Sequence, residues 1–515
     1  MSLARVGDFF RRLSGWRALL ASILAGAVYA LGFAPLDVFP AMLLGLAAFV
    51  LLLDGASARP RPLRHAAWIG WGFGFGQFAA GMHWIFYPFL VDPLEHAWQI
   101  PFVLVLFPGG LALFTTLAAA VAMRFWRFSR VFVFAACYAG AEWLRGHVLT
   151  GFPWNLPGYG WGASLAILQS TALLGVYGLS LLTVLFGASL AELFGARPRW
   201  TLPVAMTALF ATLWLGGVIR LESQPTAFTS VHLRLVQPNV PQDEKYVRAL
   251  APRNWQTLMS LSSRAGGVHA IQPDVVIWPE AAPPVLLQRS PDALADIAVL
   301  TGKSRVLITG NQRLVVDANG KRHFFNSLYV FGPGGRVAAT YDKFHLVPFG
   351  EYLPLEDVLE RIGITKLVGF PGSFSAGDGP HTVDVPGAPP AGPLICYEIL
   401  FPAAVVGATR PAWFVNVTDD SWFGPWAGPR QHLLAARVRA IEEGLPLARA
   451  ANTGISAVVD GKGRIVAQRG LDETGVVDAL LPRAEPATPY ATTGDLLFFV
   501  LLILFAALPQ ALLRR

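Results

Sequence analysis

The stretch Gly392-Pro-Leu-Ile-Cys396-Tyr-Glu398 places a cysteine at the end of an apolar run that is typical of a β-strand. Two similar places lie upstream, where Trp278-Pro-Glu280 and Tyr341-Asp-Lys343 end or follow β-like runs. A cysteine, a carboxylate and an ammonium group are the parts of a nucleophilic thiol with its base and a cationic stabiliser. Because the chain around them is built like a membrane protein, we expect acyl chemistry at a lipid surface.

The composition supports a membrane protein. Of 515 residues, 54% are hydrophobic and only 14% are charged, whereas soluble domains have about 25% charged residues. The length allows two or three domains, and two cysteines provide no disulfide framework. The formal charge of +7 could indicate nucleic-acid binding, but the basic residues lie between apolar segments and not on one patch, so we expect no nucleic-acid partner.

Eight apolar stretches have lengths near the roughly 20 residues that a spanning helix needs. They are residues 17–35, 38–54, 67–90, 100–123, 131–148, 163–190, 201–219 and 494–512. The first is not a cleavable signal peptide, because further spans follow at once and no convincing small-residue cleavage site is present. We therefore expect eight transmembrane helices.

The arginines predict how these spans are oriented. They cluster before the first span, in every second loop and after the last span, at residues 5–12, 59–64, 124–130, 197–199 and 514–515. Since positive residues favour the cytoplasmic side, both termini are predicted to be cytoplasmic and residues 220–490 to lie on the far side. The alternative is that these arginines flank the helices at random. For a bacterium, we expect a multi-pass protein of the inner (cytoplasmic) membrane with a periplasmic catalytic domain.

The segment from about 225 to 488 has a different pattern. Short β-like runs at 231–236, 275–278, 306–309, 327–331, 393–396 and 413–417 alternate with helical patterns at 252–264, 292–302 and 430–443. This alternation predicts an α/β domain in which helices cover a sheet. The expected domains are residues 1–224 with seven helices, 225–488 as the catalytic insert, and 489–515 as the last helix.

The candidate site residues have distinct roles in this hypothesis. Glu280 follows a strand that looks buried, and desolvation raises the pKa of a carboxylate toward the range of a useful base. Lys343, together with the backbone N–H after Cys396, is the candidate stabiliser of an oxyanion. Glu351 is placed to orient Lys343 or to polarise an attacking amine. Taken one by one, each has an ordinary alternative: a small buried cysteine, or a solvated Glu or Lys.

The flanking sequences favour the catalytic interpretation. Trp-Pro-Glu280, Tyr-Asp-Lys343-Phe-His-Leu-Val-Pro-Phe-Gly-Glu351-Tyr and Ile-Cys396-Tyr-Glu resemble the Glu-Lys-Cys triad of the nitrilase (carbon–nitrogen hydrolase) superfamily. The later blocks at 416–424, 428–432 and 449–456 support this. With eight spans around the insert, the chain is most similar to the membrane-bound apolipoprotein N-acyltransferase family. It departs from the usual pattern at Pro238, where Gly is usual, and at Asp419, where Asn is common.

This resemblance implies a four-layer αββα sandwich for the insert. It implies transfer of an acyl chain from a phospholipid, typically phosphatidylethanolamine, to the α-amino group of the S-diacylglyceryl cysteine that begins an apolipoprotein. The implied reaction is ping-pong through a thioester on Cys396, with Glu280 as base and with Glu351, Tyr397 and Glu398 as supporting residues. We expect no cofactor, no metal and a monomer.

Two further segments have open interpretations. Residues 363–380 form either an ordinary surface loop or a mobile lid that contacts lipid through Leu367, Val368, Phe370 and Phe374. The aromatic stretch 151–161, predicted on the same side as the insert, is either the floor of a lipid entrance or an interfacial aromatic belt, and both can hold.

Two other functions compete with acyl transfer. The first is a membrane-tethered amidase or nitrilase that hydrolyses a small substrate, which the same triad would serve with water as second nucleophile. The second is a transporter or channel, which the spans disfavour because Glu142 and Arg145 lie near a helix end and few other charges are intramembrane.

Overall fold

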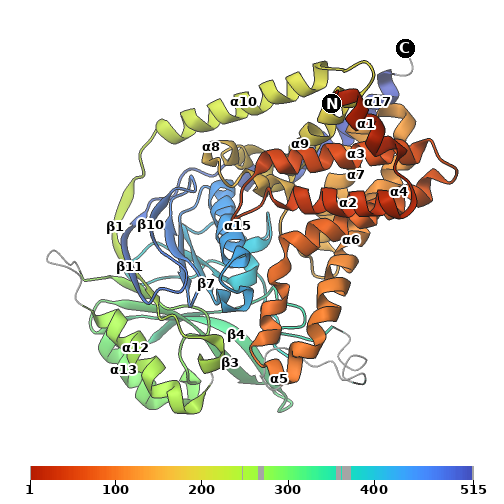
Figure 1. The fold of residues 1–515 in the computed structure, drawn as a ribbon. Coiled ribbons are helices and arrows are strands. Elements are labelled where there is room, and N and C mark those ends of the chain that lie inside the picture. Colours follow the sequence, from red (N-terminus) through yellow and green to blue (C-terminus); the bar gives the residue numbers. More distant parts are fainter. Residues whose placement is uncertain (1, 246, 265–271, 355–360, 362–372, 513–515) are drawn as a thin grey trace. The chain divides into compact units, whose positions relative to one another are not determined.

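The structure is a computed structural model that describes residues 2–245, 247–264, 272–354, 361 and 373–512 (Figure 1). By its internal contacts the chain divides into two units. The first contains Met1–Phe86, Trp98–Gln224 and Thr488–Arg515, and the second contains Tyr87–Ala97 and Pro225–Ala487. The segment Tyr87–Ala97, which we assigned to the membrane domain, therefore packs with the catalytic unit.

The first unit is helical. Its longer helices are α1 (Leu3–Arg12), α2 (Gly15–Ala30), α3 (Phe39–Ser57), α4 (Pro62–Gly81), α6 (Ile100–Arg124), α7 (Trp126–His147), α9 (Thr171–Leu190), α10 (Thr201–Glu222) and α17 (Leu496–Leu512). Among the described residues, four helical segments are long and apolar enough to cross a membrane: Phe39–Ser57, Pro93–Arg124, Thr171–Phe194 and Thr201–Glu222. The helices Gly15–Ala30 and Leu496–Ala507 are apolar but shorter.

Two of the expected spans are interrupted. The third stops at Gly81, and the chain continues as the 3₁₀-helix η1 (His83–Leu90), which contains Pro88. A proline lacks the N–H that a continuous α-helix needs at that position. The sixth is divided into α8 (Leu165–Leu168) and α9, whose residue Gly175 has a φ of 63°. A side chain there would be strained, and its Cβ would lie 2.1 Å from the ring of Tyr490.

Small residues let two helices of this unit approach closely. A Cβ on Gly26 of α2 would lie 2.0 Å from the carbonyl oxygen of Phe73 in α4. A Cβ on Gly76 of α4 would lie 1.9 Å from the carbonyl oxygen of Ile23 in α2. Such contacts between backbones are typical of packed helices in membranes.

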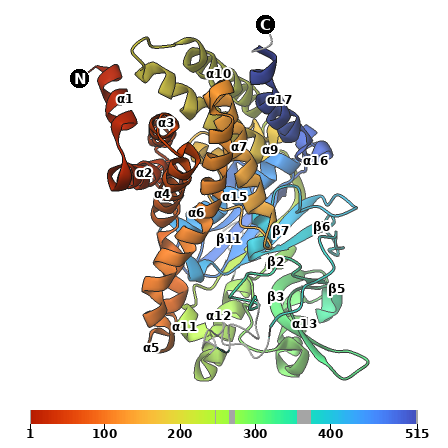
Figure 2. The ribbon, with the colours of Figure 1, turned by 90° about the vertical axis from the view of Figure 1, so that its right-hand side faces the viewer.

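The arginine-bearing ends of several helices meet around Asp54 at the end of α3. Arg11 of α1 and Arg130 of α7 both pair with its carboxylate, and Arg130 also donates to Glu192 at 2.7 and 2.9 Å. Arg59 donates to the carbonyl oxygens of Arg12 and Leu13. In both views, α1 and the end of α17 lie at the same end of the helical unit (Figures 1 and 2). The ion pairs thus bring together the ends of α1, α3 and α7, which we predicted on one side of the membrane.

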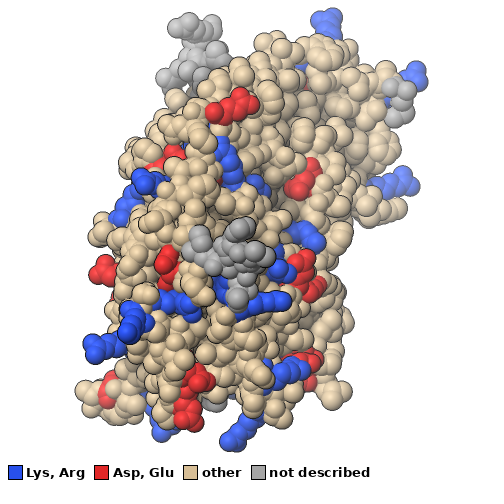
Figure 3. Space-filling view, turned by 90° about the vertical axis from the view of Figure 1, so that its left-hand side faces the viewer, with Lys and Arg blue, Asp and Glu red and all other residues tan. Residues whose placement is uncertain are grey.

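The surface carries charges of both signs. On the face drawn in Figure 3, Lys and Arg side chains alternate with Asp and Glu side chains among wide uncharged areas. Both signs of charge are thus present on this face.

The aromatic stretch 151–161 lies in the interior of the helical unit. Trp154, Tyr159 and Trp161 are each at most 4% exposed. The Trp161 indole N–H donates to Thr183 at 2.9 Å, and the Asn155 side chain donates to the carbonyl oxygen of Gly81 at 3.1 Å. This burial does not fit an exposed aromatic belt. The same stretch is fastened to α7, because Arg145, which pairs with Glu142, donates to the carbonyl oxygen of Phe152.

The second unit contains two mixed sheets. The six-stranded sheet has the order β11-β1-β2-β3-β4-β5, with β1 (Phe228–Gln237), β2 (Val275–Ile277), β3 (Val306–Val316), β4 (Arg322–Phe331), β5 (Val337–Asp342) and β11 (Gly475–Pro482). The five-stranded sheet has the order β10-β9-β8-β7-β6, with β6 (Ala391–Ile395), β7 (Trp413–Thr418), β8 (Leu447–Ala451), β9 (Ser456–Val459) and β10 (Ile465–Arg469). The six strands predicted by their residue ranges are confirmed, and β5 is the β-like run expected before Lys343. Strands β8 to β11 were not predicted.

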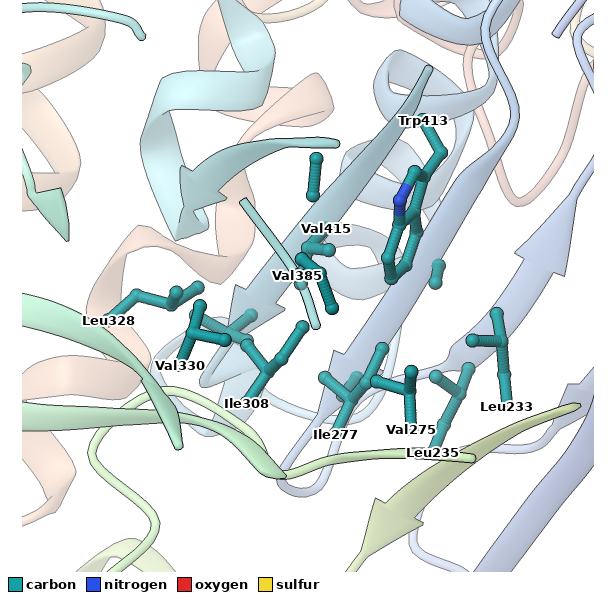
Figure 4. Packing of buried hydrophobic residues seen from close by; sticks show 14 of the residues in the cluster. Leu233, Leu235, Val275, Ile277, Ile308, Leu328, Val330, Val385, Trp413 and Val415 are labelled. Carbon is teal, nitrogen blue, oxygen red and sulfur yellow. The ribbon is translucent and has the colours of Figure 1, made fainter. Parts of the chain in front are cut away.

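The main core of this unit draws on both sheets. In Figure 4, Leu233, Leu235, Val275, Ile277 and Ile308 of the first sheet project toward Trp413 and Val415 of the second. A second apolar cluster joins α12 (Ala251–Ser263) and α13 (Pro291–Thr301) to the six-stranded sheet. A third joins α15 (Ala427–Glu443) to the five-stranded sheet. The three predicted helices are thus present, and each packs on a sheet.

Candidate active site

Three strand ends bring the predicted triad together. Glu280 follows β2, Lys343 follows β5 and Cys396 follows β6. β2 is parallel to β3, and β5 runs in the same direction because two antiparallel steps separate it from β3. The chain therefore leaves β2 and β5 at the same end of the sheet. This explains how Glu280 and Lys343, which are 63 positions apart, come to lie close together.

Glu280, Lys343 and Glu351 form one buried polar group. Lys343 Nζ lies 3.0 Å from each carboxylate oxygen of Glu351 and 3.5 Å from Glu280 Oε1. Glu280 Oε2 accepts a hydrogen bond from the backbone N–H of Asp419 at 3.0 Å. Lys343 is only 1% exposed, so this cation is held almost entirely by its two carboxylate neighbours.

The electrostatics fit a base and a permanent cation. Burial raises the pKa of Glu280, against the opposing effect of Lys343. For Lys343, burial disfavours the charge, but the carboxylates of Glu351 and Glu280 outweigh it and raise the pKa above its ordinary value. A carboxylate with a raised pKa accepts a proton more readily, and Lys343 stays charged throughout.

Cys396 sits in strained backbone at the junction of β6 and the 3₁₀-helix η9 (Cys396–Leu400), with a φ of 51°. A non-glycine residue in this region costs about 1–2 kcal/mol, and such strain is typical of functional sites. Burial first, and then the Glu280 charge, raise the pKa of the Cys396 thiol, whereas Lys343 lowers it. The resting thiol is therefore neutral and lies within electrostatic reach of both partners.

Transfer of the Cys396 thiol proton to Glu280 removes one of the effects that raise the pKa of the thiol. Once Glu280 is protonated, its negative charge no longer opposes the thiolate, while the Lys343 cation still favours it. The arrangement can therefore generate a thiolate without adding net charge to a buried site.

The sequence is similar to that of known proteins over its whole length. Residues 25–189 match the family described as the apolipoprotein N-acyltransferase N-terminal domain, and residues 233–487 match carbon–nitrogen hydrolase. The apolipoprotein N-acyltransferase of Rhodopseudomonas palustris is 42% identical over 527 residues, covering 100% of this chain and 98% of the relative. That of Bradyrhizobium diazoefficiens is 44% identical and covers 95% of this chain and 94% of the relative.

The chain belongs to the apolipoprotein N-acyltransferase family. The resemblance inferred from the motifs is thus confirmed. Among solved structures, a carbon–nitrogen hydrolase from Helicobacter pylori is 18% identical, with a TM-score of 0.37, and covers 49% of this chain and 88% of that chain.

In this family member, Glu398 braces the turn at the cysteine. Its carboxylate accepts from the backbone N–H groups of Ile395 and Phe344, each at 2.7 Å, and from the Tyr341 hydroxyl at 3.0 Å. Burial raises its pKa to about 7, although these donors favour the ionised form. Glu398 therefore ties the segment after β5 to the end of β6, which carry Lys343 and Cys396.

Tyr397 is also buried. Its ring lies 5.0 Å from the Phe401 ring, edge to face, and 5.8 Å from the His345 ring. His345 stacks on Phe401 with 3.5 Å between ring centroids. The side chain of Tyr397 thus packs in an aromatic group beside the turn.

Sequence reasoning gave no role to Asn326, although it bridges the two carboxylates. Its side-chain amide donates to Glu280 Oε1 at 2.8 Å and to Glu351 Oε1 at 2.7 Å. Asn326 lies in β4, and an isolated asparagine in a strand carries no motif that would have identified it.

Lys245 was also missed, and it explains the departure at Asp419. Lys245, in α11 (Gln242–Lys245), pairs with the Asp419 carboxylate and donates to the carbonyl oxygen of Glu280 at 3.1 Å. Both members of the pair are buried. The carboxylate of Asp419 therefore has a buried cationic partner, and the backbone N–H of Asp419 donates to Glu280 at 3.0 Å.

Lys245→Met is expected to destabilise the second unit by about 3–5 kcal/mol, because it leaves the Asp419 carboxylate buried without its cation. The double variant Lys245→Met/Asp419→Asn should regain a large part of this loss, since no buried charge remains unpaired. Thermal unfolding of the full-length protein in detergent measures both effects.

Lys303→Met, which removes an exposed lysine of the same unit, is the matched control and should change stability by less than about 0.5 kcal/mol. A double variant no more stable than Lys245→Met would show that the ion pair does not account for the loss.

The predicted lipid contacts Leu367, Val368 and Phe370 lie outside the described residues. Phe374 is described and half-buried, and its N–H donates to the carbonyl oxygen of Glu351 at 2.9 Å. Contact of Phe374 with lipid stays a prediction. Among the described residues, no group of three or more His, Cys, Asp or Glu side chains is arranged to hold a metal ion.

Proposed function

We propose that this protein transfers a fatty acyl chain from a phospholipid to the α-amino group of the S-diacylglyceryl cysteine at the start of an apolipoprotein. The observation that carries the proposal is the buried Glu280–Lys343–Glu351 group beside the strained Cys396, in a chain of the apolipoprotein N-acyltransferase family. Relatives bearing that printed name match over essentially the full length.

In the first half-reaction, Glu280 takes the thiol proton and Cys396 Sγ attacks the carbonyl carbon of the phospholipid ester. A C–S bond forms and the carbonyl oxygen becomes an oxyanion, which Lys343 and the backbone N–H of Tyr397 stabilise. The ester C–O bond then breaks, and Glu280 returns the proton to the departing lysophospholipid oxygen. The acyl chain remains on Cys396 as a thioester.

In the second half-reaction, the amine of the lipoprotein attacks the thioester carbon, and Glu280 takes a proton from the nitrogen. The C–S bond breaks, an amide bond remains on the product, and the Cys396 sulfur is reprotonated by Glu280. The same carboxylate serves both half-reactions, which is consistent with its hydrogen bonds to Asn326 and to the Asp419 backbone.

We further propose that residues 1–224 and 489–515 form an eight-helix membrane domain of the bacterial inner membrane, with residues 225–488 as an αββα domain on the periplasmic side. Helical segments lie within the expected spans, although the third and the sixth are interrupted. The ends of α1, α3 and α7, where Arg11, Asp54 and Arg130 lie, meet around Asp54. The packing of α12 and α13 on one sheet and α15 on the other supports the four layers. The proposed donor is phosphatidylethanolamine, and the proposed active form is a monomer.

Incubating the wild-type protein with phosphatidylethanolamine alone and analysing the Cys396 peptide by mass spectrometry tests this function. We expect a fatty-acyl adduct that disappears when a synthetic diacylglyceryl-cysteine peptide is added, with appearance of the triacylated peptide. Release of free fatty acid at the same rate without peptide would favour the membrane-tethered hydrolase. Absence of any adduct from wild-type protein would refute the thioester.

A further inference from the structure

A buried histidine contacts the backbone of the cysteine turn from the side of α15. His432 Nε2 lies 3.1 Å from the carbonyl oxygen of Cys396, and its Nδ1 lies 2.9 Å from Asp420 Oδ1 and 3.1 Å from Arg449 Nη2. All three side chains are at most 1% exposed. The catalytic scheme above makes no use of this group.

The partners of the ring determine where its proton lies. A carbonyl oxygen can only accept a hydrogen bond, so Nε2 must carry a proton and donate to Cys396, whichever group Nδ1 engages. Asp420 and Arg449 are themselves joined at 2.6 Å, and Thr418 donates to Asp420 at 2.9 Å. The ring is therefore held on both sides by groups that are fixed in their turn.

The same network reaches the strand that carries the cysteine. Arg449 donates to the side-chain oxygen of Asn416, whose amide donates to the carbonyl oxygen of Leu394 at 3.0 Å. Leu394 lies in β6, two residues before Cys396. Hydrogen bonds thus hold His432 in a fixed position relative to the end of β6, where it binds the carbonyl group of Cys396.

The peptide between Cys396 and Tyr397 connects this contact to the chemistry. A peptide unit is planar, and in the trans form its C=O and N–H point in opposite directions. Fixing the Cys396 carbonyl oxygen on His432 therefore fixes the direction of the Tyr397 N–H. At the preceding residue, Glu398 accepts from the N–H of Ile395 at 2.7 Å, so the strained φ of 51° at Cys396 is clamped on both sides.

We propose that His432 is a positioning residue that, through the carbonyl group of Cys396, aims the Tyr397 N–H at the oxyanion formed on the acyl donor. Asp420 and Arg449 hold the ring in place for this purpose. The inference rests on the proposed function, since it needs an oxyanion to form at Cys396.

Comparing two reactions of Cys396 Sγ distinguishes a positioning role of His432 from a merely structural one. Alkylation of Cys396 by iodoacetamide forms a C–S bond by displacing iodide and develops no oxyanion. Acylation by phosphatidylethanolamine develops one. In a Cys137→Ser background, which leaves Cys396 as the single thiol, both rates are measurable by mass spectrometry of the Cys396 peptide in the full-length protein.

We expect His432→Leu to slow acylation by about 10–100-fold, somewhat less than the loss of an entire oxyanion donor, and to change alkylation by less than about twofold. His432→Gln, which can place an N–H near the position of Nε2, should restore much of the acylation rate. If His432→Leu does not fold, His432→Asn replaces it with the same expected result, because its amide is too short to reach the Cys396 carbonyl oxygen.

If His432→Leu is acylated at the parent rate, His432 is not a positioning residue, although the proposed function still stands. Equal losses in acylation and alkylation would lead to the same conclusion. Failure of the Cys137→Ser parent to acylate at all, while iodoacetamide still labels Cys396, would instead overturn the proposed function and with it this inference.

Discussion

Replacing Cys396 by serine is expected to lower acyl transfer by about 10⁴-fold or more, as removal of a catalytic nucleophile does. A serine hydroxyl is far less acidic than a thiol, and Glu280 is not a strong enough base to ionise it. Mass spectrometry should find no acyl adduct on the variant, and transfer to a diacylglyceryl-cysteine peptide should fall to the background rate.

The other cysteine provides the control. Cys137 lies in α7 of the helical unit, is free, and has no part in the proposed chemistry, so Cys137→Ser should keep the wild-type rate. Cys396→Ser should also reach the membrane and unfold at nearly the wild-type temperature, because the substitution changes a single buried atom. Substantial transfer by a correctly folded Cys396→Ser variant would remove the thioester from the mechanism.

Glu280→Gln is expected to slow both half-reactions by about 10²–10⁴-fold, the usual contribution of a general base. An amide cannot take the thiol proton, although it can keep hydrogen bonds to its neighbours. Rapid mixing should show slower formation of the acyl enzyme, and the isolated wild-type acyl enzyme should transfer its chain far faster than the acylated variant.

The role of Glu280 as a base also predicts how the acyl-transfer rate depends on pH. Glu280 acts as a base only when ionised, and burial raises its pKa above the ordinary 4.5. The wild-type rate should therefore fall as pH decreases through a value above 4.5, and this acid limb should be missing from Glu280→Gln. Glu443→Gln, at a buried glutamate at the end of α15 away from the triad, is the matched control. An unchanged second half-reaction in Glu280→Gln would exclude Glu280 from that step.

Chain order and strand ends were enough to identify the residues that meet at the site. Glu280, Lys343 and Cys396 each follow an apolar strand. β2 and β5 run in the same direction in one sheet and deliver Glu280 and Lys343 to the same end of it, whereas Cys396 comes from β6 of the other sheet. The contact of Glu351 with Lys343 was predicted as one of two roles, whereas Glu398 was named only as a supporting residue through the family resemblance. Its hydrogen bonds to the turn at Cys396 come from the structure. The fold class followed from the six strands that were predicted, whose apolar runs alternate with helical patterns. The equally buried strands β8 and β9 were missed.

The other residues of the site could not be predicted, because they depend on contacts between residues far apart in the sequence. Asn326 and Lys245 are single polar residues whose partners lie 46 and 174 positions away. β10 has five residues and none of them is fully buried, so hydrophobic periodicity gives little signal there. The third span was overestimated because His83–Leu90 is apolar in composition, whereas its backbone has left the α-helix.

The assignment of Tyr87–Ala97 to the second unit has a practical consequence. A Cβ on Gly424, which has a φ of 64°, would lie 2.4 Å from the ring of Tyr87, so this ring rests directly on the turn that follows Asp420. The second unit is thus built from two stretches of chain, which are separated by more than a hundred residues of the helical unit. A fragment of residues 225–487 would therefore lack Tyr87, whose ring covers Gly424. To complete the second unit, residues 87–97 would have to be added as a separate peptide or joined to the fragment.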